Sequence, residues 1–228
     1  MPPYRAGCRP STSKVARRIN IPMTPHGINA LLFDIGGVVI DIDFNRAFEH
    51  WQPISRLSVD ELRAAFKVDV PYQRHERGEI TASEYFAHLG KSLQLQDDQA
   101  RIAEGWNAIL VQEITETRRM VEAARTRFPC YAFTNSNAVH QAAWSAMFPM
   151  VVQCFDRVFV SSEIGHRKPE RKAFEFVANT LGISVNSMMF FDDLPENVAG
   201  AVAAGMEAVH VRSPADVKSA LLALGCAL

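Results

Sequence analysis

Four short stretches of the sequence combine carboxylates, a hydroxyl, an amide and a lysine. The residues are Asp34 in FDIGG, Thr134 and Asn135 in TNSN, Lys168 in HRKP, and Asp192 and Asp193 in FFDDLPEN. Carboxylate oxygens are ligands that Mg²⁺ prefers, while a hydroxyl and an ammonium group can hold phosphate oxygens. Together these groups could bring a carboxylate and a phosphate group within reaction distance around one divalent cation.

Short apolar runs precede these stretches and predict the elements that position them. The runs cover residues 29–34, 130–134, 157–160, 187–192 and 207–211. They alternate with helix-length segments such as 169–181, in which apolar residues repeat at helical spacing. This alternation predicts an α/β fold with a doubly wound parallel sheet that is buried on both faces. Ligands bind beyond the carboxyl ends of such strands, so we expect the four stretches to meet at one edge.

A long segment separates the first two predicted strands. About 95 residues lie between them, far more than a normal strand-to-strand crossover needs. The segment 45–112 has no strand-like run, and two capping boxes within it, Ser58 with Glu61 and Thr81 with Glu84, predict helix starts. We therefore predict that residues 45–112 form an inserted helical domain.

The remaining residues are divided between a core and an extension. The predicted core comprises residues 23–44 and 113–228. Residues 1–22 contain five basic residues and no acidic residue. We interpret them as a disordered or non-native extension, with a targeting presequence as the alternative.

The charge and the composition of the chain argue against several kinds of binding partner. A formal net charge of −1 gives no electrostatic basis for binding nucleic acid or a membrane surface. No apolar stretch reaches the roughly 18 residues that a membrane helix needs. The four cysteines lie far apart, so neither a disulfide framework nor a zinc site is indicated. We expect a cytoplasmic protein whose partner is a small phosphorylated metabolite.

In the order DxG, TN, KP and DD, the four stretches resemble the motifs of the haloacid dehalogenase superfamily of aspartate-nucleophile hydrolases. The resemblance runs from about residue 29 to the end of the chain. It implies that Asp34 attacks phosphorus and forms an aspartyl-phosphate. It also implies that Thr134 holds the transferring phosphate and that Lys168 neutralises Asp34 and the phosphate.

The same resemblance implies a Mg²⁺ site and a cap. Asp34, Asp193 and the carbonyl group of Gly36 would be metal ligands, and Asp192 would support the metal directly or through water. The inserted helices would correspond to the mobile cap of the family, which closes over the site and selects the substrate.

Residue 36 departs from the pattern of most phosphatases in this superfamily, which have a second Asp two positions after the nucleophile. Gly36 cannot protonate a leaving group, although general acid catalysis contributes about 10²-fold to 10⁴-fold. Three explanations stay open. The leaving alcohol could depart easily, as the anomeric oxygen of a sugar 1-phosphate does; Asp41, Asp43 or His75 could replace the acid; or catalysis could be weak.

Several longer stretches are similar to a bacterial subgroup of sugar-phosphate phosphatases that also lacks the second Asp and includes α-D-glucose-1-phosphate phosphatase activity. They are FDIGGVVIDIDFNRAFEHW, YQRHERGEIT, the Gly105-Trp106 pair and FFDDLPENVAGA. This similarity implies a sugar phosphate substrate such as a hexose 1-phosphate.

A sugar needs polar contacts and a flat apolar face. The candidates for binding it are His75, Glu76, Arg77 and Trp106, although the charged run 75–79 could equally be a solvated helix end. Asn135 is a further candidate for substrate binding, because its amide groups suit phosphate, but it could also be a turn residue.

Two other functions stay open. A 2-haloacid dehalogenase would use the same aspartate to displace halide from carbon without a metal, but that subgroup has an aromatic residue where this chain has Gly36. A catalytically weak, binding-only protein on the same scaffold is the other alternative. A phospho-receiver domain fits less well, because its acidic pair lies near the first strand and it has no inserted cap.

Overall fold

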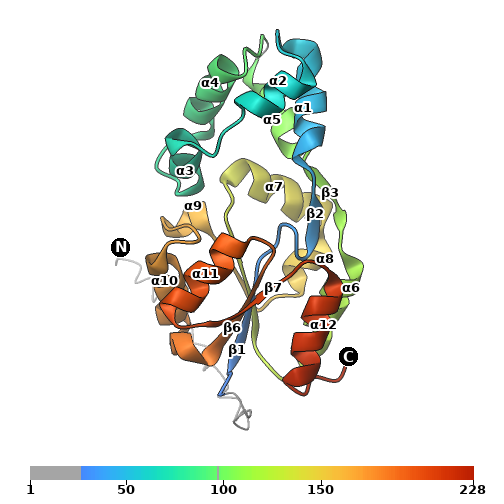
Figure 1. Ribbon diagram of the computed structural model, residues 1–228, viewed down its shortest axis with the longest axis vertical. Helices are drawn as coiled ribbons and strands as arrows, with labels where there is room; N and C mark the ends of the chain where they lie inside the picture. Colours follow the sequence, from blue (N-terminus) through green and yellow to red (C-terminus); the bar gives the residue numbers. More distant parts are fainter. Residues whose placement is uncertain (1–26, 97) are drawn as a thin grey trace, which may run out of the picture.

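The structure of the protein is a computed structural model that describes residues 27–96 and 98–228. A five-stranded parallel sheet forms its centre (Figure 1). Its strand order is β5-β4-β1-β6-β7. The strands are β1 (Ala30–Phe33), β4 (Cys130–Thr134), β5 (Arg157–Val160), β6 (Met188–Asp192) and β7 (Glu207–His210). The α/β fold class with a parallel sheet is confirmed. The extension predicted at residues 1–22 lies outside the described residues.

Helices cover both faces of this sheet. In the central strand β1, Leu31 and Phe33 belong to the apolar cluster on one face, whereas Ala30 and Leu32 belong to the cluster on the other. Because alternate side chains of a strand point to opposite faces, a strand buried on both faces is apolar throughout. This arrangement explains why the run that precedes Asp34 is uniformly apolar.

The core helices form two layers around the sheet (Figure 1). One layer contains α10 (Arg171–Leu181) and α11 (Pro195–Ala204), and the other contains α6 (Thr115–Ala124) and α12 (Pro214–Ala223). The other helical elements of the core are α7 (Ala138–Met147), α8 (Pro149–Gln153), α9 (Ser161–Ile164) and a 3₁₀ turn at Val185–Ser187. None of the helices in the described part of the chain has the length and apolarity needed to cross a membrane.

Five further helices stand together beyond one end of the core (Figure 1). They are α1 (Phe44–Trp51), α2 (Val59–Ala65), α3 (Val70–Glu76), α4 (Ala82–Ser92) and α5 (Gln99–Asn107), with a 3₁₀ turn at Gln52–Ile54. We call them the inserted helices. Both predicted capping boxes are present, at the starts of α2 and α4.

A two-stranded ribbon joins the inserted helices to the core. Strands β2 (Ile40–Ile42) and β3 (Leu110–Glu113) pair in antiparallel orientation. We expected no strand in the segment 45–112. This expectation was wrong at residues 110–112, which belong to β3. Strands of three and four residues carry too few side chains for their alternation to be visible in the sequence.

Candidate active site

The carboxyl ends of neighbouring strands bring the predicted site residues together. Asp34 follows β1, Thr134 ends β4 and Asp192 ends β6, and β1 lies between the other two strands. The backbone N–H of Asp34 donates to the carbonyl of Phe191 over 2.8 Å. The parallel register thus places these three side chains at one edge of the sheet.

Lys168 is the positive centre of this edge. Its side chain is fully buried, and its Nζ lies 2.9 Å from Asp34 Oδ2 and 2.7 Å from Asp192 Oδ2. Burial alone lowers the pKa of a lysine, but Asp192 and Asp34 outweigh this effect and raise the pKa of Lys168. A buried charge is tolerated only when it is paired in this way. Lys168 therefore stays an ammonium group beside Asp34.

Asn135 positions this lysine. Its Oδ1 accepts a hydrogen bond from the backbone N–H of Lys168 over 2.8 Å, and its Nδ2 donates to the carbonyl of Lys168 over 2.9 Å. The predicted role of Asn135 was substrate binding. The structure instead shows its side-chain amide engaged with the backbone of Lys168.

Asp192 is held by a network that the sequence did not reveal. Its Oδ1 accepts from the backbone N–H of Leu194 and from Nδ2 of Asn197, each over 2.9 Å. Asn197 is buried in the first turns of α11. Asn197 lies five residues after Asp192, and the turn into the helix brings the two side chains together.

Three carboxylates gather beside this lysine. Oxygen atoms of Asp34, Asp192 and Asp193 lie within 4.8 Å of one another. Burial raises the pKa of Asp34 well above its usual range. Burial, assisted by the negative charge of Asp192, raises the pKa of Asp193 to about 6. A divalent cation would offset this crowding of negative charge.

The chemistry of these donors fits Mg²⁺, which binds carboxylate and carbonyl oxygens. Asp34 and Asp193 would hold the ion, with the carbonyl of Gly36 as the predicted further ligand. Asp192 is already engaged by Lys168 and Asn197, so a supporting position next to the ion suits it best.

A cavity of about 540 Å³ connects this edge with the inserted helices. From the core it is lined by Asp34, Gly36, Thr134, Asn135, Asn137, His140, Arg167, Asp193, Leu194, Glu196 and Asn197. The ribbon and inserted helices, with the residues that connect them, contribute Ile42, Phe44, Phe66, Val68, Tyr72, Glu76 and Ile109. The core carboxylates and the inserted helices therefore share one cavity.

Two of the predicted sugar contacts, Trp106 and His75, do not line this cavity. Trp106 is 1% exposed and stacks on His140 with 4.7 Å between the ring centroids. His75 is 4% exposed and stacks on Tyr85 at 4.5 Å. Both rings pack in the apolar interior of the inserted helices, because burying a flat aromatic side chain is strongly favourable.

The remaining two predicted substrate contacts form ion pairs between the inserted helices and the core. Arg77 pairs with Glu170 over 3.0 Å, and Glu76 pairs with Arg167 over 2.7 Å. Burial raises the pKa of Glu76, and the positive charge of Arg167 opposes this shift. Glu76 and Arg167 both line the cavity, whereas Arg77 does not. The two pairs hold α3 against the loop that precedes α10.

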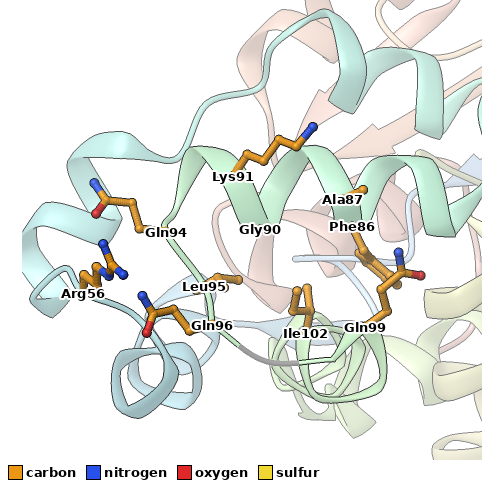
Figure 2. Close-up of a pocket in the computed structure, with 10 residues that line it drawn as sticks. All are labelled: Arg56, Phe86, Ala87, Gly90, Lys91, Gln94, Leu95, Gln96, Gln99 and Ile102. Carbon is orange, nitrogen blue, oxygen red and sulfur yellow. The ribbon is translucent and has the colours of Figure 1, made fainter.

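A second hollow, of about 500 Å³, lies on the inserted helices (Figure 2). Its wall includes Arg56, Lys91, Gln94 and Gln99. None of the predicted site residues lines it, and its described wall residues include no carboxylate. The cavity beside Asp34 is therefore the candidate active site.

The model of one protein family, described as haloacid dehalogenase-like hydrolase, matches residues 28–205. The chain belongs to the haloacid dehalogenase-like hydrolases. The match covers the carboxyl ends of β1, β4 and β6, which carry Asp34, Thr134 and Asp192.

Two proteins similar to this chain are phosphatases by name. Phosphatase MT3486 of Mycobacterium tuberculosis is 28% identical over 196 residues, which cover 81% of this chain and 87% of the relative. D-ribitol-5-phosphate phosphatase of Bacteroides thetaiotaomicron is 23% identical over 85% of this chain and 97% of the relative.

A solved structure from the same family contains the expected ligands. A haloacid dehalogenase family enzyme of Bacteroides thetaiotaomicron, in complex with magnesium and inorganic phosphate, aligns with a TM-score of 0.70 and 27% identity. The alignment covers 80% of this chain and 93% of that chain. The three carboxylates and the buried lysine of this chain are groups that suit both ligands of that enzyme.

Proposed function

We propose that this hydrolase cleaves phosphate monoesters of small metabolites through an aspartyl-phosphate formed on Asp34. The observation that carries the proposal is the contact of 2.9 Å between Asp34 Oδ2 and the buried Nζ of Lys168, next to the carboxylate of Asp193. A nucleophilic carboxylate, a buried ammonium group and a set of metal ligands therefore meet at one edge of the sheet, next to the cavity.

The reaction would proceed in two displacements at phosphorus. A carboxylate oxygen of Asp34 attacks phosphorus, the bond from phosphorus to the ester oxygen breaks, and the leaving oxyanion takes a proton from water. Water then attacks phosphorus, the bond between phosphorus and the Asp34 oxygen breaks, and inorganic phosphate and the Asp34 carboxylate are released. Mg²⁺, when bound, supplies positive charge that offsets the repulsion between carboxylate and phosphate.

The other residues of the cavity would bind and orient the phosphate. Lys168 lies close enough to Asp34 to neutralise charge on both reacting groups. Thr134 ends β4 at the same edge and lines the cavity, where its hydroxyl can donate to a phosphate oxygen. Asn135 would act through Lys168, whose backbone it holds.

We propose that the inserted helices act as a cap over this site, on the core predicted at residues 23–44 and 113–228, of which residues 23–26 lie outside the described part of the chain. Glu76 and the other inserted residues that line the cavity support this assignment. The ion pairs of Glu76 with Arg167 and of Arg77 with Glu170 support a closed arrangement of cap and core.

The proposed reaction does not by itself identify the alcohol that is esterified to phosphate in the substrate. The sequence predicts a sugar phosphate such as a hexose 1-phosphate, and the relative that acts on D-ribitol 5-phosphate supports a phosphorylated sugar alcohol. This substrate stays a prediction, and the lining of the cavity provides an independent criterion for it below.

Turnover of phenyl phosphate with and without Mg²⁺ tests the proposed reaction. We expect metal-dependent release of inorganic phosphate that falls at least about 10³-fold in Asp34→Asn, since the nucleophile is lost. Asp60→Asn is the matched control, because this carboxylate lies on the surface in an ion pair with Arg63. Metal-independent release of halide from a 2-haloacid, without phosphatase activity, would favour the dehalogenase instead.

A further inference from the structure

The part of the cavity wall that comes from the ribbon and the inserted helices is mainly apolar. Phe44 and Phe66 have ring centroids 5.5 Å apart, and Phe66 and Tyr72 have centroids 6.0 Å apart. These three rings form a continuous aromatic wall, and Ile42 and Ile109 extend it. Such a wall binds apolar surface and gives little to a ring of hydroxyl groups.

Most polar side chains that line the cavity outside the phosphate site already have partners within the protein. They include Asn135 with Lys168, Asn137 with the start of α7, His140 with the carbonyl of Trp106, Asn197 with Asp192, and Glu76 with Arg167. A sugar must give up hydrogen bonds to water when it binds, and unmatched polar groups are costly. These engaged side chains are a poor replacement for that water.

The described residues that line the cavity also offer no free positive charge for a second anionic group. The guanidinium of Arg167 pairs with the carboxylate of Glu76 over 2.7 Å, so their charges cancel. Glu196, another lining residue, is exposed and would repel an anion. A leaving alcohol without a charge of its own suits this lining best.

Apolar side chains continue to the rim of the cavity. Val68 from the inserted segment is 55% exposed, and Leu194 from the core is 44% exposed. Exposed apolar residues on both sides of one opening indicate a site that binds an apolar ligand.

We propose that this cavity selects phosphate monoesters of apolar alcohols, above all aromatic ones, over sugar phosphates. The inference rests on the proposed phosphatase reaction and names the substrate class of the same site. It also agrees with Gly36, because a phenol, with a pKa of about 10, leaves with less need of an acid than an aliphatic alcohol does.

A series of 4-alkylphenyl phosphates tests this selection at nearly constant leaving-group acidity. With Mg²⁺ present, kcat/KM should rise from phenyl to 4-ethylphenyl and 4-butylphenyl phosphate by about twofold to fourfold per added methylene. The matched polar probe is 4-(2-hydroxyethyl)phenyl phosphate, which should be hydrolysed at least about fivefold less efficiently than 4-propylphenyl phosphate.

Two valines of equal exposure provide matched variants. Val68 and Val202 are 55% and 56% exposed, but only Val68 lines the cavity. We expect Val68→Ser to lower the ratio of kcat/KM for 4-butylphenyl phosphate to kcat/KM for phenyl phosphate about threefold to tenfold. Val202→Ser should leave both values within twofold of the unmodified protein.

The outcomes separate this inference from the reaction on which it rests. If phenyl phosphate is hydrolysed but kcat/KM does not change along the alkyl series, the apolar selection is wrong and the phosphatase reaction stands. A higher kcat/KM for glucose 1-phosphate than for 4-butylphenyl phosphate would also overturn the selection. If no phosphate monoester is hydrolysed in the presence of Mg²⁺, the proposed reaction itself is wrong.

Discussion

Gly37 lies directly against the carboxylate of Asp193. A Cβ atom at position 37 would be 2.3 Å from Asp193 Oδ2, much closer than any real contact between such atoms. Gly37 also has a φ of +70°, a left-handed conformation that glycine adopts without steric cost. The second glycine of FDIGG therefore makes room for a candidate metal ligand that lies more than 150 residues later in the chain.

We expect Gly37→Ala to weaken Mg²⁺ binding about tenfold or more, because the new methyl group must displace the carboxylate of Asp193. The control is Gly165→Ala, since Gly165 has a φ of +73° and a methyl group there would have no atom of the described residues within 4 Å. Both variants carry a backbone cost of about 1–2 kcal/mol. Calorimetric Mg²⁺ titration of the two proteins separates the specific effect, and equal affinities would contradict it.

Replacing the buried lysine should destabilise the fold as well as abolish activity. Lys168→Met leaves Asp34 and Asp192 without their shared positive charge, which costs about 3–5 kcal/mol of unfolding free energy. Adding Asp192→Asn should recover part of this loss. Urea unfolding measures both effects, with Lys172→Met on the exposed side of α10 as the control. A loss of less than about 1 kcal/mol in Lys168→Met would show that the pairs are weak.

An acid introduced at position 36 should change how strongly kcat depends on the acidity of the leaving alcohol. The backbone of Gly36 is not left-handed, and a Cβ there would meet Ile42 Cδ1 at 3.3 Å, so a small shift accommodates a side chain. We expect Gly36→Asp to raise kcat for an alkyl phosphate at least about tenfold relative to kcat for an aryl phosphate. Gly36→Asn has the same size without the acid and should not do so. An unchanged ratio would show that leaving-group protonation does not limit the reaction.

His75 should make the stability of the protein sensitive to mild acid. Burial lowers the pKa of His75 from 6.5 to about 4. Below pH 6.5 the unfolded chain therefore binds a proton that the folded chain does not, so the unfolding free energy falls as the pH decreases toward 4.

The variant His75→Phe removes this effect and retains an aromatic ring against Tyr85. Between about pH 7.5 and pH 5, the variant should lose about 1–2 kcal/mol less unfolding free energy than the unmodified protein. Urea unfolding at the two pH values measures the difference. His50→Phe serves as the control, because the side chain of His50 is 37% exposed. Parallel losses in the unmodified and His75→Phe proteins would contradict the buried neutral state.

The local pattern of the sequence was sufficient for the sheet and for part of the site. The apolar runs predicted all five strands of the parallel sheet, and the capping boxes predicted the starts of α2 and α4. Since the ends of parallel strands share an edge, the clustering of Asp34, Asp192 and Asp193 could also be expected. These features depend on residues near one another in sequence or on the general geometry of a sheet.

The tertiary structure decided which polar and aromatic side chains face the cavity. Trp106 and His75 have residue types that suit sugar binding, yet packing between helices buries both of them. Asn135 suits phosphate, yet its amide groups hold a backbone segment more than 30 residues away. The sequence by itself determined which chemical groups the protein carries and the strand ends that hold several of them. Only folding assigned each group a partner, because those contacts join residues with no local relationship.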